Sequence, residues 1–270
     1  MAFASDIYKG GKLPSRYKMV ISHPKTQEIA ATVFLGNGGE GFAYQNFISG
    51  NDITRSERVV DALPFTISTP GLYYLTEDLT CPEGTHGITV EADDVTLDLR
   101  GFSLVGPGSG GFFRGVNMRE VRNFEIRNGT IRNFTRDGIY SFDNVVEGAS
   151  HRVTNMRVVG NGGTGIHLYG DSHYVAECTV LNNGGSAIIC SASTIVRNVC
   201  SMSAQEGIDT NFGSVVAENT CRENGFSGIK GMFGVTIMNN SCSDNTYHGI
   251  FAYGGCTVRG NSCYSNGESG

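Results

Sequence analysis

Residues 216–236 read Val-Ala-Glu-Asn-Thr-Cys-Arg-Glu-Asn-Gly-Phe-Ser-Gly-Ile-Lys-Gly-Met-Phe-Gly-Val-Thr, and this unit decides the fold. Its short runs alternate between apolar and polar residues, and Asn and Gly separate the runs. Such a pattern predicts short β-strands joined by turns. A pair of helices with their turns needs roughly 33 residues or more, and leucine-rich repeats need a Leu-x-x-Leu-x-Leu frame that is absent here.

The unit recurs through the last third of the chain. The steps between Val180, Cys200, Cys221, Cys242 and Cys263 are 20, 21, 21 and 21 residues. Two polar columns and a column of isoleucines, each preceded by a small residue, keep the same phase: Asn198, Asn219, Asn240 and Asn261; Asn161, Asn183, Ser203, Asn224, Asn245 and Asn266; Gly165-Ile166, Ala187-Ile188, Gly207-Ile208, Gly228-Ile229 and Gly249-Ile250. A fixed period of this length indicates stacked supersecondary units. We therefore predict a parallel β-solenoid with three short strands in each coil of about 21 residues, in which neighbouring coils lie about 4.8 Å apart.

Stacked coils assign a place to each column. We expect the isoleucines to point inward as a dry aliphatic stack, and the cysteines to be free thiols that act as small buried hydrophobes. Asn suits the turns, because it tolerates left-handed backbone and can satisfy main-chain groups that a bend leaves unpaired. No Cys-x-x-Cys pair is present, so a zinc site is not expected.

The repeat is less regular towards the N-terminus. Earlier pairs at Gly87-Ile88, Gly115-Val116 and Gly138-Ile139 are spaced by 28 and 23 residues, and a further 27 residues lead to Ile166. These longer coils predict loops inserted between the strands.

Two segments before the regular repeat carry a family resemblance. Residues 64–76 read Pro-Phe-Thr-Ile-Ser-Thr-Pro-Gly-Leu-Tyr-Tyr-Leu-Thr, and residues 94–102 read Asp-Val-Thr-Leu-Asp-Leu-Arg-Gly-Phe. Followed by coils rich in Asn and Gly, they resemble the right-handed parallel β-helix proteins of the pectate-lyase-like superfamily, over roughly residues 64–270. The resemblance implies an all-β, right-handed parallel β-helix of about eight or nine coils, which we assign to residues 61–270.

The two ends of the chain depart from the repeat. Residues 1–60 lack it, and residues 18–22 and 28–35 predict a hairpin. We expect this segment to be an irregular N-terminal cap or an attachment segment, because the first coil of a solenoid otherwise exposes an unpaired strand edge.

At the other end of the chain, residues 266–270 repeat the turn that precedes each isoleucine. We expect an open last coil that frays, continues in a longer solenoid or pairs with another subunit.

The composition of the chain limits the classes of binding partner and the cellular location that can be expected. The net charge is −6 and Lys and Arg are not clustered, which argues against nucleic acid as a partner. The chain contains no run of about 18 apolar residues, so a membrane span is not expected. The N-terminal residues lack the pattern of a secretory signal peptide. We expect an extracellular or virion-surface protein, and a virion protein is released by lysis without a signal.

Strand alternation predicts where function is located. If each isoleucine points inward, the next residue and the residue two further on point outward. These outward columns, called the strip below, are Tyr140, His167, Ile189, Asp209, Lys230 and Phe251, and Phe142, Tyr169, Ser191, Asn211, Met232 and Tyr253. Asp143, Asp171 and His173 follow in the adjoining turns.

Such a strip suits an acidic polysaccharide, because aromatic faces stack on sugar rings and Asp or Asn side chains bond to hydroxyl groups. We predict that it binds or processes such a polymer. The predicted substrate-binding residues are Tyr140, Phe142, Asp143, Asp171, Asn211, Phe251 and Tyr253.

Lyase or C5-epimerase chemistry on a uronate polymer requires a cation that neutralises the carboxylate, a base and an acid. We assign Lys230 as the neutralising cation, His167 and Tyr169 as base and acid, and Asp209 as the partner of Lys230. Residues 140–143, Tyr-Ser-Phe-Asp, resemble the start of the Tyr-Gly-Phe-Asp-Pro-His motif of alginate C5-epimerases. The Pro and His of that motif are replaced here by Asn144 and Val145.

No cofactor is expected. Pectate lyases of this fold use Ca²⁺, but a calcium ion takes about six oxygen ligands or more. Asp93, Asp94 and Asp98 are close in sequence but do not supply an assignable set of such ligands.

Two alternatives stay open. Asp209 and Lys230 in adjacent coils are also compatible with a plain surface ion pair, and stacked aromatic residues with a structural surface. The whole solenoid is also compatible with a fibre subunit or virion tail appendage that forms homo-oligomers or assembles head to tail through its last coil.

Overall fold

The computed structural model describes residues 17–22, 29–35, 57–142 and 148–270. The chain divides into two compact units, Met1–Thr54 and Arg55–Gly270. In the first unit, β1 (Tyr17–Ser22) and β2 (Ile29–Leu35) pair as an antiparallel hairpin, which confirms the predicted hairpin. The role of residues 1–60 as a cap or attachment segment stays a prediction.

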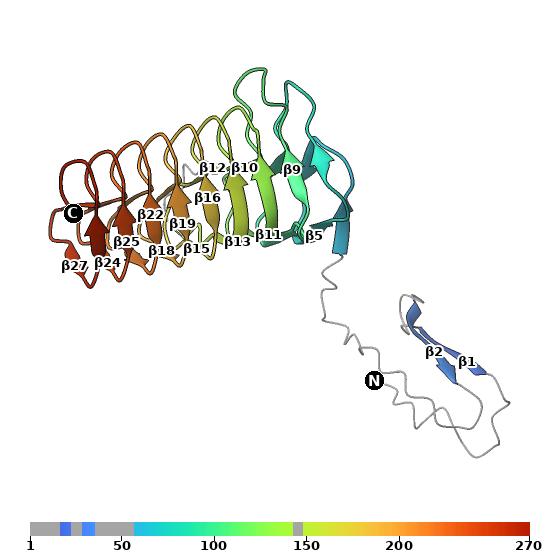
Figure 1. The fold of residues 1–270 in the computed structure, drawn as a ribbon. Coiled ribbons are helices and arrows are strands. Elements are labelled where there is room, and N and C mark those ends of the chain that lie inside the picture. The colour runs from blue at the N-terminus through green and yellow to red at the C-terminus, as the bar shows by residue number, and fades with distance from the viewer. Residues whose placement is uncertain (1–16, 23–28, 36–56, 143–147) are drawn as a thin grey trace, which may run out of the picture. The chain divides into compact units, whose positions relative to one another are not determined.

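The second unit is a parallel β-solenoid whose coils stack along one axis (Figure 1). One face of it is a nine-stranded parallel sheet, so the predicted number of coils is confirmed. Its strands, in spatial order, are β4 (Phe65–Ile67), β7 (Ile88–Val90), β10 (Val116–Arg119), β12 (Ile139–Phe142), β14 (Ile166–Leu168), β17 (Ile188–Cys190), β20 (Ile208–Asn211), β23 (Ile229–Met232) and β26 (Ile250–Tyr253).

Two further parallel stacks complete each coil, and the long strands β11 (Glu125–Arg132) and β13 (Arg152–Val159) belong to both. One stack also contains β3 (Glu57–Val60), β5 (Gly71–Leu75), β8 (Val95–Asp98), β15 (Tyr174–Ala176), β18 (Thr194–Val196), β21 (Val215–Ala217), β24 (Thr236–Met238) and β27 (Thr257–Arg259). The other contains β6 (Leu79–Thr80), β9 (Ser103–Val105), β16 (Thr179–Leu181), β19 (Val199–Ser201), β22 (Thr220–Arg222), β25 (Ser241–Ser243) and β28 (Ser262–Tyr264). The solenoid therefore begins at β3, slightly before residue 61.

Strand register places the repeat columns inside the solenoid. Ile188 lies between Ile166 and Ile208 in the nine-stranded sheet, and all three side chains are fully buried. The cysteines behave in the same way, because Cys221 pairs in register with Cys200 and Cys242 and all three are buried free thiols. The predicted aliphatic stack and the predicted thiol column are therefore the core of the fold.

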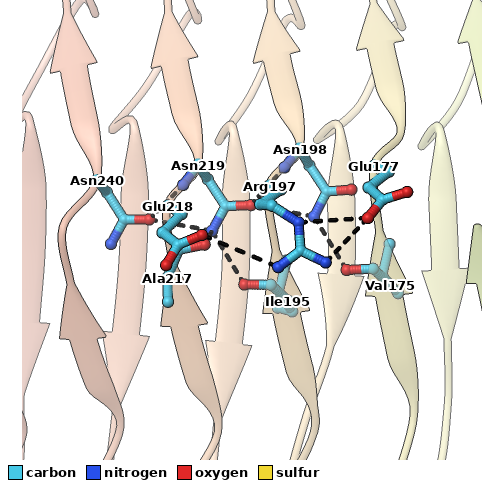
Figure 2. A network of polar contacts seen from close by, with 9 residues as sticks. All are labelled: Val175, Glu177, Ile195, Arg197, Asn198, Ala217, Glu218, Asn219 and Asn240. Carbon is cyan, nitrogen blue, oxygen red and sulfur yellow. Dashed lines mark hydrogen bonds and ion pairs between the residues drawn. The ribbon is translucent and has the colours of Figure 1, made fainter. Parts of the chain in front are cut away.

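Asparagine side chains connect one coil to the next (Figure 2). The Asn198 side-chain amide donates to Asn219 Oδ1 at 3.0 Å, and the Asn219 amide donates to Asn240 Oδ1 at 3.0 Å. The same amide of Asn219 also donates to the Ile195 carbonyl at 3.0 Å. Beside this ladder, Arg197 forms an exposed ion pair with Glu177 at 2.9 Å. The amide bonds satisfy main-chain groups at the bend and fix the register of neighbouring coils.

The second asparagine column is interrupted at Ser203. On one side of it Asn161 donates to Asn183 Oδ1 at 3.1 Å, and on the other Asn224 donates to Asn245 Oδ1 at 2.9 Å. Among the described residues, the buried hydroxyl oxygens of Ser201 and Ser203 have no hydrogen-bond partner. The shorter serine side chain therefore leaves the ladder incomplete.

We expect Ser203→Asn to raise the free energy of unfolding by about 1 kcal/mol, because the amide restores a buried hydrogen bond to each neighbouring coil. Urea unfolding followed by circular dichroism measures this change. Asn224→Ser is the matched control, and it should lower the free energy of unfolding because it creates a second gap in the ladder. A destabilised Ser203→Asn variant would show that the column does not accept an asparagine at this coil.

Candidate functional site

The predicted strip lies on the outer face of the nine-stranded sheet. Tyr140 pairs with His167, His167 with Ile189, and Ile189 with Asp209 in successive strands. Asp209 pairs with Lys230, which pairs with Phe251. From β12 to β23 the residues directly before and after these positions are buried, which agrees with the predicted outward orientation; in β26, Ile250 is only partly buried and Ala252 is exposed.

The strip contains two separate groups of polar residues. His167 and Lys230 are three strands apart, which corresponds to about 14 Å at the usual spacing of roughly 4.8 Å. The apolar side chain of Ile189 lies in the column between His167 and Asp209. Lys230 therefore does not lie where it could neutralise a carboxylate on a sugar bound at His167.

The first group is the tyrosine–histidine cluster, which consists of Tyr140 and Phe142 on β12 with His167 and Tyr169 at β14. The His167 and Tyr169 rings stack with centroids 4.5 Å apart, and the edge of Tyr140 meets His167 at 5.4 Å. Phe142 contacts Tyr169 at 6.2 Å. The backbone nitrogen of Tyr169 donates to the hydroxyl of Ser141 at 2.9 Å, which positions the residue just after its strand.

Arg114 brings a cation to this cluster, and the sequence analysis did not identify it. Its guanidinium lies 3.6 Å from the centre of the Tyr140 ring. Its Nε donates to Asp137 Oδ2 at 2.9 Å, and its Nη1 donates to Asn117 Oδ1 at 3.2 Å. These contacts hold the charged group against the aromatic face, an arrangement that stabilises a partly desolvated arginine.

A hollow of about 530 Å³ opens beside this arginine, on the side of β10. It is lined by Arg114, Asn117, Arg119, Glu120, Tyr140 and Phe142. A pocket with aromatic walls and two guanidinium groups has the chemistry that binds a sugar ring with a carboxylate.

Two residues of the cluster have shifted pKa values, and both shifts favour the uncharged side chain. Burial lowers the pKa of His167, the charge of Asp137 opposes this shift, and Arg114 and Arg136 lower the pKa further. Burial raises the pKa of Tyr140, while Arg114 opposes that shift. His167 is therefore a neutral imidazole that can accept a proton, and Tyr140 is a protonated phenol that can donate one.

The second group is an ion-paired cluster on β20 and β23. Lys230 Nζ lies 3.0 Å from Asp209 Oδ2 and 4.0 Å from Glu206 Oε1. Burial acts to lower the pKa of Lys230, but the hydrogen bond and charge of Asp209 and the charge of Glu206 raise it overall. Burial raises the pKa of Asp209, and its hydrogen bond to Lys230 opposes that shift. The lysine charge is therefore largely balanced within the cluster.

The remaining predicted residues differ in what they contact. Asp171 accepts a hydrogen bond from the Gly148 backbone at 2.9 Å. The Asn211 Oδ1 atom is buried and has no hydrogen-bond partner among the described residues. Phe251 and Tyr253 are exposed on β26. Asp143 lies outside the described residues.

Residues 57–142 and 148–270 contain no group of three or more His, Cys, Asp or Glu side chains arranged to hold a metal ion. Within the described part of the chain, no helix is long and apolar enough to cross a membrane.

The phase of the repeat contained a signal for the missed polar residues. Arg114 precedes inward Val116 by two positions, as Asp137 precedes Ile139 and Glu206 precedes Ile208. These residues belong to one column in the turn that leads into the nine-stranded sheet. Aligning that turn, and not only the strands, would have identified them.

The architecture and the sequence together define the class of protein. Residues 114–270 match the family model described as a right handed beta helix region, so the chain belongs to the right-handed β-helix family. The predicted fold and handedness are thereby confirmed. No curated protein sequence is significantly similar to the chain.

Solved structures that are similar to the chain include two mannuronan C-5 epimerase modules of Azotobacter vinelandii. The mannuronan C-5 epimerase AlgE4 A-module is 12% identical, with a TM-score of 0.50 over 76% of this chain and 81% of that chain. The AlgE6 A-module is 12% identical, with a TM-score of 0.39 over 79% of this chain and 88% of that chain. Tailspike protein 2 of bacteriophage CBA120, as its enzymatically active domain, is 11% identical, with a TM-score of 0.35 over 74% of this chain and 38% of that chain. At this level of identity the likeness establishes the fold alone.

Proposed function

We propose that this protein binds an acidic polysaccharide along the strip and transfers a proton on a uronate sugar at the tyrosine–histidine cluster. The observation that carries the proposal is the Arg114 guanidinium, held 3.6 Å from the Tyr140 ring and beside a hollow that it lines. A fixed cation next to a neutral histidine and a protonated tyrosine is the set of groups that this chemistry requires.

The geometry supports specific roles. Arg114 pairs with the uronate carboxylate and so acidifies the C5–H bond, and His167 takes the C5 proton. In β-elimination, the electron pair of the C5–H bond forms the C4=C5 double bond, and Tyr140 or Tyr169 protonates the C4 oxygen as the C4–O bond breaks. In C5-epimerisation, a tyrosine instead returns a proton to C5 from the opposite face. Lys230, about 14 Å from His167, then contacts a different sugar of the same polymer.

The test uses the whole chain with polygalacturonate and alginate. Elimination produces an unsaturated uronate that absorbs in the ultraviolet, and epimerisation changes the C5 configuration seen by proton NMR. We expect one of these products, together with binding that weakens as salt is added, because carboxylate–arginine pairs are screened. Arg114→Ala should reduce binding and product formation. The absence of binding to both polymers would contradict the proposal.

A second candidate function, assembly through the last coil, is favoured by the exposure of that coil. Each of β26, β27 and β28 pairs in register with one neighbouring strand within the described residues. Val258 and Tyr264 in this coil are exposed. An unpaired parallel edge can pair with a further coil or with another subunit. Light scattering over a range of concentrations tests assembly, and a monomer at high concentration would contradict it.

A further inference from the structure

Exposed aromatic residues gather on both sides of the strip at its C-terminal coils. On the side where strands begin, the Phe226 and Tyr247 rings stack with centroids 5.2 Å apart and planes within 13°. On the side where strands end, the Phe212 and Phe233 rings stack at 5.9 Å, also within 13°. We call these two pairs the aromatic rails. They lie beside β20, β23 and β26, in the same sheet as the tyrosine–histidine cluster, and β17 separates them from that cluster.

The second rail lies at a bend that does not require an aromatic side chain, since Ala192 holds the same position in the preceding coil with φ 47°. Phe212 and Phe233 have φ values of 51° and 62°, in the left-handed region, where a bulky residue is strained. The next residue in their column is Gly254, which has φ 73° and suits such a bend without strain. Phe212 is 64% exposed and Phe233 is 46% exposed, so neither ring gains much by burial in the core. Aromatic rings kept in an unfavourable conformation on the surface indicate a binding role.

Charge differs between the two ends of the strip. Around the tyrosine–histidine cluster, the three cations Arg114, Arg119 and Arg136 outnumber the two carboxylates, because Asp137 pairs with both Arg114 and Arg136 and Glu120 lines the hollow. Among the outward residues of the described strands β17, β20, β23 and β26, Lys230 is the sole Lys or Arg, and Asp209 and Glu206 already pair with it. A uronate is therefore attracted to the cluster but gains little from charge at the aromatic rails.

We infer that the aromatic rails bind a stretch of uncharged sugars in the same polymer whose uronate occupies the tyrosine–histidine cluster. The faces of neutral sugar rings expose C–H groups that stack on aromatic rings, and the partly exposed side chains of Lys230 and Asp209 between the rails offer partners for hydroxyl groups. The inference rests on the proposed function and narrows its substrate class. The substrate is a heteropolysaccharide of acidic and neutral sugars, and a plain polyuronate fits the strip less well.

The experiment compares two polymers on the full chain by titration calorimetry at low salt. Gellan fragments separate glucuronate residues with neutral sugars, whereas polygalacturonate consists of uronates. We expect tighter binding of gellan. The double substitution Phe212→Gly and Phe233→Gly should lower the affinity for gellan about tenfold, leave the affinity for polygalacturonate unchanged, and leave the melting temperature unchanged or raised. Tyr264→Ala, which removes an exposed aromatic ring from another sheet, should change neither affinity.

The possible outcomes separate this inference from the proposed function. If both polymers bind with equal affinity and the double variant behaves as the parent, the inference fails and the proposed function stands. If neither polymer binds, the proposed function fails as well. A double variant with a lowered melting temperature would assign the rails to the fold. A parent protein that dimerises where the double variant is monomeric would assign them to a second copy of the chain.

Discussion

Replacing His167 with alanine should lower the turnover of a uronate polymer by about 10²–10⁴-fold, the usual contribution of a positioned acid–base group. Burial, with Arg114 and Arg136 nearby, lowers the pKa of this imidazole, so the parent protein keeps a neutral base at neutral pH. The value of kcat/KM should therefore stay high as the pH falls to somewhat below 6.5, the pH at which an ordinary histidine is half protonated. Initial rates across a range of pH measure both effects.

The matched control for this variant is Ile189→Ala, because Ile189 occupies the next position of the same outward column. It should change kcat little, since its side chain carries no group that transfers protons. The polymer affinity of His167→Ala should stay close to that of the parent if the arginine and aromatic contacts provide most of the binding. An unchanged kcat in His167→Ala would remove the histidine from the chemistry, and an equal loss in both variants would indicate damage to the sheet.

The fold was predictable because a period of about 21 residues constrains every coil at once. Once Cys200, Cys221 and Cys242 are aligned, each neighbouring column must lie inward, outward or in a turn, and the strand registers agree with that alignment. The irregular coils before residue 160 carried less information. Their inserted loops shift the phase, and a strand such as β13, which belongs to two stacks, does not stand out in the sequence.

The candidate site was predictable only in part. Alternation along β12 and β14 places Tyr140 and His167 outward in neighbouring strands, where they meet. Alternation does not reveal how far a long side chain reaches from a turn, so the contact between Arg114 and Tyr140 was missed. Alternation also does not show how far apart two positions of one column lie. The distance between His167 and Lys230 becomes visible only when the intervening coils are counted.

Two buried histidines, at the corner of the solenoid just before β13 and β15, make the fold sensitive to acid. His151 is fully buried, and its ring stacks on that of His173 with centroids 5.1 Å apart. Its Nδ1 accepts from the Phe124 backbone at 3.4 Å, while its Nε2 has no hydrogen-bond partner among the described residues. Burial, together with the neighbouring His173, lowers the pKa of His151 to about 3. The folded protein therefore keeps this imidazole neutral where an exposed histidine would take up a proton.

We expect the free energy of unfolding to fall by about 3 kcal/mol between pH 6.5 and pH 4 on account of His151 alone, because one pKa unit corresponds to about 1.4 kcal/mol. Above pH 6.5 both states hold the neutral ring and no change arises. Below that value the unfolded chain binds a proton that the folded chain rejects, until the pH approaches the folded pKa of about 3.

His151→Asn keeps an acceptor for the Phe124 backbone but does not titrate, so urea unfolding of this variant should show a shallower loss of stability across the same pH range. His86→Asn is the matched control, since it also removes an imidazole, but one that is only partly buried. Equal slopes for the parent and His151→Asn would show that the corner admits a protonated imidazole, and that acid acts on the fold through other groups.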